Sequence, residues 1–263
     1  MRFCAVTQGG AAQWGLYTVA DEGASNMRRR GLTAMSVTGM LLVAAGLLTA
    51  CTGAGEPAPT AVGDLEVEAA WVDGGRMIAV TTWGSSTCVP VAEEAVVGDD
   101  GALAVTLTDA GPQGTEQACT TDMVQRATLV GVPEGVDPAA GLEVEVTYAN
   151  AVGDAALAAV TGLAGPGTET DYAPSAGWVG TDGTFALVTW GSSSCAPELQ
   201  DLQVPSETEV AITFATPAAD RVCTMDMAPR VLLAVAEGLG GATGVDVVLQ
   251  GDTFAGTRVP ILG

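Results

Sequence analysis

Several short stretches of the chain alternate apolar and polar residues with a period of two. Apolar side chains stand at Leu103, Val105 and Leu107, and the same alternation recurs over residues 142–146 and 210–214. Residues 77–83 and 184–190 are more continuously apolar and contain many β-branched side chains. These patterns are typical of half-buried or buried strands. They predict an all-β fold of short strands, in which residues 91–97 are the one candidate for a short helix.

The chain also contains an internal repeat. Residues 71–90 (WVDGGRMIAVTTWGSSTCVP) and 178–197 (WVGTDGTFALVTWGSSSCAP) share ten of twenty positions, and residues 119–130 and 223–234 share six of twelve. Self-similarity of this kind indicates repeated structural units. We therefore expect two tandem modules, residues 62–160 and 178–263, joined by a Gly/Pro-rich linker over 161–177. Turn signals at residues 73–75 and 182–183 favour an antiparallel β-sandwich or open barrel in each module.

Each copy of the repeat contributes one pair of cysteines. Four cysteines allow three pairings, and the repeat selects Cys88–Cys119 and Cys195–Cys223, because each module should close its own bond. Each bond would close a loop of about 30 residues and contribute roughly 3–4 kcal/mol. A four-cysteine metal site is the alternative, but no CxxC spacing supports it. We expect neither a metal nor a cofactor.

The N-terminal part of the chain has the features of an export signal. Met27 is followed by three arginines and an almost uncharged run that ends Leu48-Thr49-Ala50-Cys51. This order predicts a signal peptide over residues 27–50, and its end resembles the bacterial lipoprotein box, in which the cysteine, here Cys51, is lipidated. Residues 51–61 would then be a tether, and residues 1–26 an extension upstream of the true start. A retained transmembrane helix is the alternative.

Composition excludes several kinds of chemistry. The chain has nine basic residues, all arginine, against 31 acidic ones, and no histidine, for a net charge of −22. Binding of nucleic acid needs a basic surface and is not expected. Without His or Lys, the chain has no Ser-His-Asp triad and no Schiff-base lysine. The acidity also makes calcium conceivable, but residues 98–101 do not match an EF-hand.

The duplicated polar residues are the candidate site. They are Ser85, Ser86, Asp122 and Arg126 in the first copy and Ser192, Ser193, Asp226 and Arg230 in the second. In one interpretation they line a polar ligand cleft, in which each Asp would be the only base for a serine nucleophile. In the other, Gly and Ser form a tight turn at the end of a strand, and the serine hydroxyls hydrogen-bond to backbone groups of that turn. We expect each arginine to offset a nearby carboxylate. The duplicated tryptophans, at strand ends, are expected in the core; they are Trp71, Trp83, Trp178 and Trp190.

The run W-G-S-S-[ST]-C-x-P, followed by C-T-x-D-M, resembles a motif of secreted lipoproteins from actinobacteria. The resemblance covers most of residues 51–263 and implies a location and a module type, with no catalytic residue. We expect a lipid-anchored protein on the extracytoplasmic face of the cell membrane, not an enzyme, that binds an envelope component or small ligand or supports envelope structure. The alternatives are a Ser/Asp-dependent hydrolase and a carrier of small ligands or cations.

Overall fold

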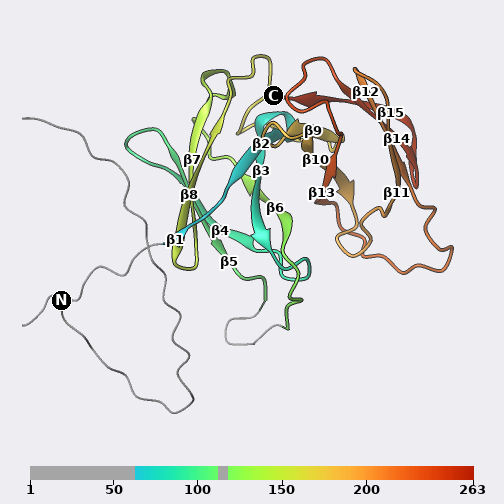
Figure 1. The fold of residues 1–263 in the computed structure, drawn as a ribbon, viewed down its shortest axis with the longest axis horizontal. Helices are drawn as coiled ribbons and strands as arrows, with labels where there is room; N and C mark the ends of the chain where they lie inside the picture. The colour runs from blue at the N-terminus through green and yellow to red at the C-terminus, as the bar shows by residue number, and fades with distance from the viewer. Residues whose placement is uncertain (1–62, 112–117) are drawn as a thin grey trace, which may run out of the picture. The chain divides into compact units, whose positions relative to one another are not determined.

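A computed structural model describes residues 63–111 and 118–263 (Figure 1). The described residues form strands, turns and two short 3-10 helices, η1 (Asp73–Gly75) and η2 (Pro138–Ala140), with no α-helix among them. The all-β prediction is therefore confirmed. Within these ranges no helix has the length and apolar character needed to cross a bilayer. The predictions for residues 1–62, including lipidation of Cys51, lie outside the described residues.

The first half of the described chain forms two sheets. One has five strands in the order β1-β8-β7-β5-β4, and the other has three in the order β2-β3-β6. Their bounds are β1 Gly63–Asp64, β2 Glu68–Val72, β3 Met77–Gly84, β4 Val91–Val97, β5 Leu103–Thr108, β6 Val124–Gly131, β7 Leu142–Tyr148 and β8 Ala151–Leu157.

The second half forms a single seven-stranded sheet in the order β11-β12-β14-β15-β9-β10-β13. A short parallel pairing of β15 with β9 joins its two parts. The bounds are β9 Ser175–Trp178, β10 Thr184–Gly191, β11 Leu199–Ser206, β12 Glu209–Phe214, β13 Ala228–Val235, β14 Asp246–Gly251 and β15 Phe254–Leu262.

The five-stranded and seven-stranded sheets are mixed, so the expectation of purely antiparallel sheets was wrong for them, whereas the β2-β3-β6 sheet is antiparallel throughout. β5 pairs with β7 in parallel, and β12 pairs with β14 in parallel at the matching place. In sequence, β6 lies between β5 and β7, and β13 lies between β12 and β14. These intervening strands pair elsewhere, β6 with β3 and β13 with β10. The chain thus crosses over before it returns, and a crossover gives parallel neighbours.

Alternation along the strands accounts for the core of each half. In β5 and β7 the apolar positions are buried, whereas Ala104, Glu143 and Glu145 face solvent. One apolar cluster draws its fully buried residues from Trp71 to Leu157, and a second draws them from Ala176 to Ile261. Each cluster takes its buried residues from its own half, and Leu262 of β15 also packs against the first cluster. The period of two in the sequence therefore arises because one face of each of these strands is buried in a core.

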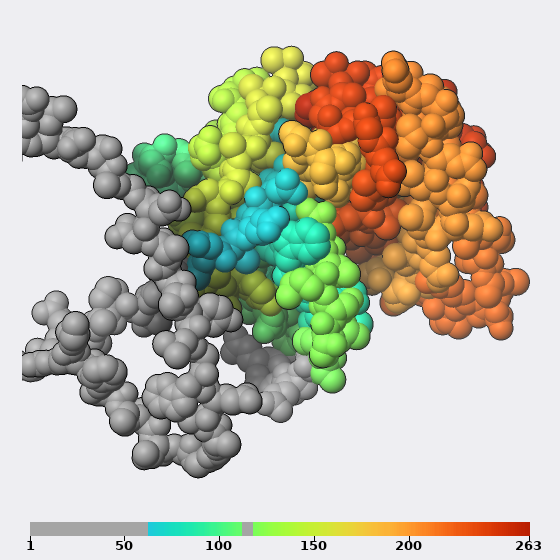
Figure 2. Space-filling model, viewed as in Figure 1, coloured from blue at the N-terminus to red at the C-terminus, as the bar shows by residue number. Residues whose placement is uncertain are grey.

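A third apolar cluster joins the two halves. Ala70, Val72 and Ala79 of β2 and β3 pack with Val179, Ala186 and Val188 of the β9–β10 hairpin. Gly177 allows this approach, since a Cβ there would collide with the Trp71 carbonyl. The described residues, 63–111 and 118–263, accordingly belong to one compact unit, and Figure 2 shows the blue β2 segment adjoining the orange and red strands.

The expected linker also carries contacts. Asp73 of η1 is almost fully buried, and its carboxylate accepts hydrogen bonds from Arg76 at 3.0 Å and from Thr170 at 2.9 Å. The backbone N–H of Asp73 donates to Ser175 Oγ at 2.7 Å, where β9 begins. The residues before β9 therefore hold the β2–β3 turn as well as connecting the halves.

Two local predictions had different outcomes. The turns at residues 73–75 and 182–183 are confirmed, because they join the antiparallel pairs β2–β3 and β9–β10. The helix candidate is wrong: Val91–Val97 is strand β4, paired with β5 across a bulge between Ala92 and Glu94. Its apolar spacing resembles a helical face, but pairing with β5 turns Ala92 and Ala95 toward the core. Tertiary pairing overrides a weak local preference.

Candidate functional site

Both predicted disulfides are present. Cys88 bonds to Cys119 and Cys195 bonds to Cys223, with Cα atoms 5.6 Å apart in each case. Each bond ties the loop that follows a long central strand, β3 or β10, to the segment that precedes β6 or β13. The duplicated Ser and Asp residues are therefore brought to one place in each half.

In the first half the loop is held by a cluster of hydroxyl groups centred on Thr120. Its Oγ1 lies 2.7 Å from Ser85 Oγ and 3.4 Å from Ser86 Oγ, and it donates a short hydrogen bond to Asp122. Asp122 also accepts the backbone N–H of Ser86 at 3.3 Å. The cluster ties together the two strand ends that the disulfide joins.

The second half repeats this cluster around Thr224. Its Oγ1 lies 2.8 Å from Ser192 Oγ and 3.3 Å from Ser193 Oγ, and it donates to Asp226. Asp226 accepts the backbone N–H of Ser193 at 3.2 Å. The predicted Ser and Asp residues thus meet in both halves, and they satisfy one another.

These contacts make the aspartates poor bases. Hydrogen bonds from Thr224 and Ser193 lower the pKa of Asp226 to about 2, and hydrogen bonds from Thr120 and Ser86 lower the pKa of Asp122. A general base works best with a pKa near the working pH. The serines therefore have no effective base in the loop, which disfavours the hydrolase alternative.

The duplicated arginines do not pair with the loop aspartates, and only Arg230 is acted on by a carboxylate charge, that of Asp252, without forming an ion pair. Arg126 is 6% exposed, and its guanidinium donates to the carbonyls of Cys88 at 2.5 Å and Trp83 at 3.2 Å. Arg230 donates to the carbonyls of Cys195 at 3.0 Å and Trp190 at 2.7 Å. Within the described residues neither arginine forms an ion pair. Their shared role is to clamp the loop backbone to the strand end.

This clamp explains the glycine that follows each strand tryptophan. A Cβ on Gly84 would lie 2.5 Å from Cζ of Arg126, and one on Gly191 would lie 3.0 Å from Cζ of Arg230. Only glycine leaves room for the guanidinium against the backbone. The W-G-S-S motif therefore has a structural explanation in each half.

The tryptophans divide into two kinds. Trp71 and Trp178 are buried, as expected, and their indole N–H groups donate to the carbonyls of Ala158 and Ala242 at 2.9 Å. Trp83 is 45% exposed, so the expectation of a core position was wrong for it. Trp190 is half-buried and meets Tyr172 edge to face.

The two halves differ in what covers the arginine. Tyr148 pairs with Leu107 in the β5–β7 ladder, and Gly251 holds the matching place, opposite Phe214. The Tyr148 ring lies 5.9 Å from the Arg126 guanidinium carbon, and its hydroxyl donates to Asp109 at 2.6 Å. Gly251 has φ of +77°, and a Cβ there would collide with the Phe214 carbonyl. The second half therefore has no aromatic ring at this position.

A cavity of about 290 Å³ lies beside Arg230 in the second half. Its polar wall is formed by Arg221, Arg230, Asp252 and Ser192, and its other walls come from the disulfide, Pro217 and Ala218, among others. Burial lowers the pKa of Arg230, while the charge of Asp252 acts in the opposite direction. The Nε–H group of Arg230 is buried and has no hydrogen-bond partner in the described part of the chain. The Nε–H group of Arg126 is unpartnered as well, so the second half differs in the open space beside its guanidinium group.

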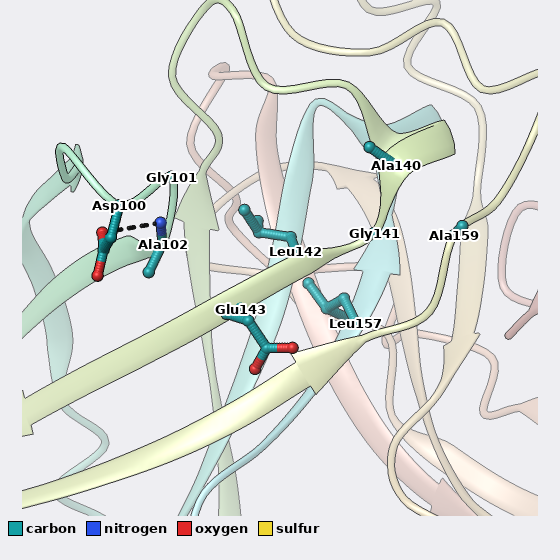
Figure 3. Close-up of a pocket in the computed structure, with 9 residues that line it drawn as sticks. All are labelled: Asp100, Gly101, Ala102, Ala140, Gly141, Leu142, Glu143, Leu157 and Ala159. Carbon is teal, nitrogen blue, oxygen red and sulfur yellow. Dashed lines mark hydrogen bonds between the residues drawn. The ribbon is translucent and has the colours of Figure 1, made fainter.

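A larger hollow of about 480 Å³ lies in the first half, between the β4–β5 turn and the β7–β8 pair (Figure 3). The only charged side chains that line it are Asp100, in the β4–β5 turn, and Glu143, in β7, and they do not face each other in Figure 3. Asp100 already accepts the N–H of Ala102 at 3.1 Å. Without converging polar groups, this hollow is a weaker candidate.

Sequence reasoning selected Ser192 and Arg230 but missed Arg221, Asp252 and Gly251. All three lie where the copies differ, since Gln117 aligns with Arg221 and Tyr148 with Gly251. A search for matching residues passes over such positions. Comparing the copies for differences would have drawn attention to them.

The chain has no match to a protein-family model, to a curated protein or to a solved structure. Its function is therefore inferred from its own residues.

Proposed function

We propose that this chain is a lipid-anchored extracytoplasmic binding protein built from two copies of one β module. The first copy, residues 62–160, is closed over its arginine, and the second copy, residues 178–263, holds a small ligand in the cavity beside its disulfide. Matching disulfides, matching loop clusters and the same strand order support the duplication.

Two features of the chain support the proposed location, a lipoprotein-like signal and two disulfide bonds. The run that ends at Cys51 fits a lipoprotein signal, and two disulfides favour an oxidising compartment outside the cytoplasm. Acyl chains on Cys51 would hold the protein at the outer face of the membrane.

The observation that carries the binding function is the cavity beside Arg230. Everything that the two copies share is explained by holding the disulfide loop in place. The cavity exists where the second copy departs from the first, with Gly251 in place of the ring of Tyr148 and with Arg221 added to its wall. Its volume is near the lower end of the range for small-molecule sites.

Blocking the cavity tests this function. Ala218 lines the cavity and is exposed, whereas its neighbour Ala219 is exposed but does not line it. Compounds from a panel of organic acids, amino acids, sugars and metal ions that bind the cavity will raise the Tm of the wild-type protein. The same compounds should leave A218W unchanged and still stabilise A219W. Stabilisation that persists in A218W would show that the cavity is not the binding site.

The membrane anchor is tested by C51S. We expect this variant to accumulate as unprocessed precursor or to be released from the membrane. Normal processing with full membrane retention, measured by fractionation and intact mass, would contradict lipidation at Cys51.

A further inference from the structure

The cavity beside the second disulfide is lined by two arginines. The described residues contain five arginines. Arg76 pairs with Asp73, and Arg258 pairs with Glu209 and Asp246. Arg126 is buried under Tyr148. Arg221 and Arg230 remain, and both line this cavity.

Neither of these two arginines has a carboxylate oxygen within hydrogen-bonding distance in the described part of the chain. Arg221 forms an ion pair with Glu198 at 3.8 Å, and this glutamate is exposed. Arg230 uses its two terminal nitrogens on carbonyl groups, and the charge of Asp252 acts on it without an ion pair. An anion in the cavity would therefore meet two guanidinium groups.

Asp252 sets the number of charges that the cavity can accept. Two arginines and one aspartate line it, so the charged side chains of its own wall sum to +1. Glu198, the ion-pair partner of Arg221, lines the adjoining hollow and adds a second negative charge nearby. A single negative charge balances this wall, whereas a second charge would be repelled by Asp252. Pro217, Ala218 and the disulfide give the same cavity apolar surface. A carboxylate on a short apolar body fits both parts.

We propose that the ligand of this cavity is a small monocarboxylate, whose carboxylate group is held by the guanidinium groups of Arg221 and Arg230. This inference rests on the proposed binding function and names its ligand class. Arginine suits the task because its planar fork matches carboxylate geometry.

A series of probes of equal chain length tests the charge preference. The full-length protein, labelled with ¹⁵N at arginine, is titrated with butyrate, butanol, butylammonium and, at equal ionic strength, inorganic phosphate. With few arginines in the chain, their Nε–H signals can be assigned by substitution. We expect butyrate to shift the signals of Arg221 and Arg230 in a saturable way and to leave those of Arg76 and Arg126 in place. R221Q should weaken butyrate binding at least about tenfold, as loss of one charge-assisted bond implies, and R258Q should not.

The outcomes separate the ligand class from the binding function. If butanol or butylammonium shifts the same two signals as strongly as butyrate, the monocarboxylate inference is overturned while the cavity remains a binding site. If phosphate binds as tightly as butyrate, the single-charge argument fails. If no probe in this series and no compound in the wider panel perturbs the cavity, both proposals fail together.

Discussion

Replacing Arg126 by leucine should cost far more stability than the same change at Arg230. Arg126 is 6% exposed and donates to two carbonyls and to Thr82 Oγ1, and leucine can make none of these bonds. Each hydrogen bond from a charged donor contributes about 1.5–3 kcal/mol, and the Tyr148 contact adds about 0.5–1 kcal/mol. Leucine recovers part of this loss through its apolar surface. We expect R126L to cost about 4 kcal/mol.

Arg230 makes two such bonds and borders a cavity, through which water can reach the carbonyls that R230L would leave open. We therefore expect R230L to cost about 2 kcal/mol. The exposed ion-paired Arg258 serves as control, and R258L should cost less than about 1 kcal/mol. Urea unfolding followed by tryptophan fluorescence gives the three values. Equal costs for R126L and R230L would refute the claim that only the first arginine is sealed. If R126L does not fold, R126K, which keeps the charge but not the planar fork, should still be less stable than R230K.

Three further changes test the stabilising contacts. Replacing both Cys195 and Cys223 by serine should cost about 3.6 kcal/mol, from chain entropy over a separation of 28 residues; a loss below 1 kcal/mol by urea unfolding would contradict this. D73N removes the charge from a buried ion pair and should cost about 2–4 kcal/mol, measured the same way. Burial raises the pKa of Glu68 above its usual 4.5, so the folded state favours the protonated form. Protonated Glu68 therefore contributes to the stability of the folded state. This contribution is fully present below pH 4.5, and it is lost as the pH rises through the raised pKa of Glu68. E68Q should therefore raise the Tm at neutral pH but not at pH 3, with the distant, exposed E207Q as control; an equal rise at both pH values would refute it.

The strands that carry each core were predictable because burial on one face leaves a period of two in the sequence. Leu103, Val105 and Leu107 show it clearly, and β5 has the predicted position. The disulfide pairing followed from the repeat in the same way. Whether two neighbouring strands are parallel or antiparallel was not predictable. The alternation of apolar and polar residues shows which face of a strand is buried, but it does not show which strand pairs with it. The parallel pairs β5–β7 and β12–β14 are therefore a finding of the structure.

The residues of the candidate site were predicted only in part, for a related reason. Ser192 and Arg230 stand in a duplicated motif, and duplication drew attention to them. The second half has Gly251 where the first half has the aromatic side chain of Tyr148. Gly251 lies opposite Phe214 in a parallel strand pair, and no local sequence pattern reveals that pairing. The contacts of Arg126 and Arg230 with backbone carbonyls were likewise not predictable. Every residue has a backbone carbonyl, so the sequence does not show which carbonyl an arginine will contact.

The repeat offers a way to separate residues that the fold needs from residues that a ligand would need. The Gly, Ser, Thr, Asp and Arg of the loop have the same partners in both copies, so the fold alone accounts for their presence twice. Tyr148 and Gly251 stand at one position of the module and differ, and this difference decides whether the guanidinium beneath is covered or open. The open guanidinium lies in a chain of net charge −22, whose overall field repels anions. Multiply charged anions are repelled most by that field, and Asp252 in the cavity wall opposes them again at short range. Among anions, the field and the wall therefore both favour a ligand with a single negative charge over one with several.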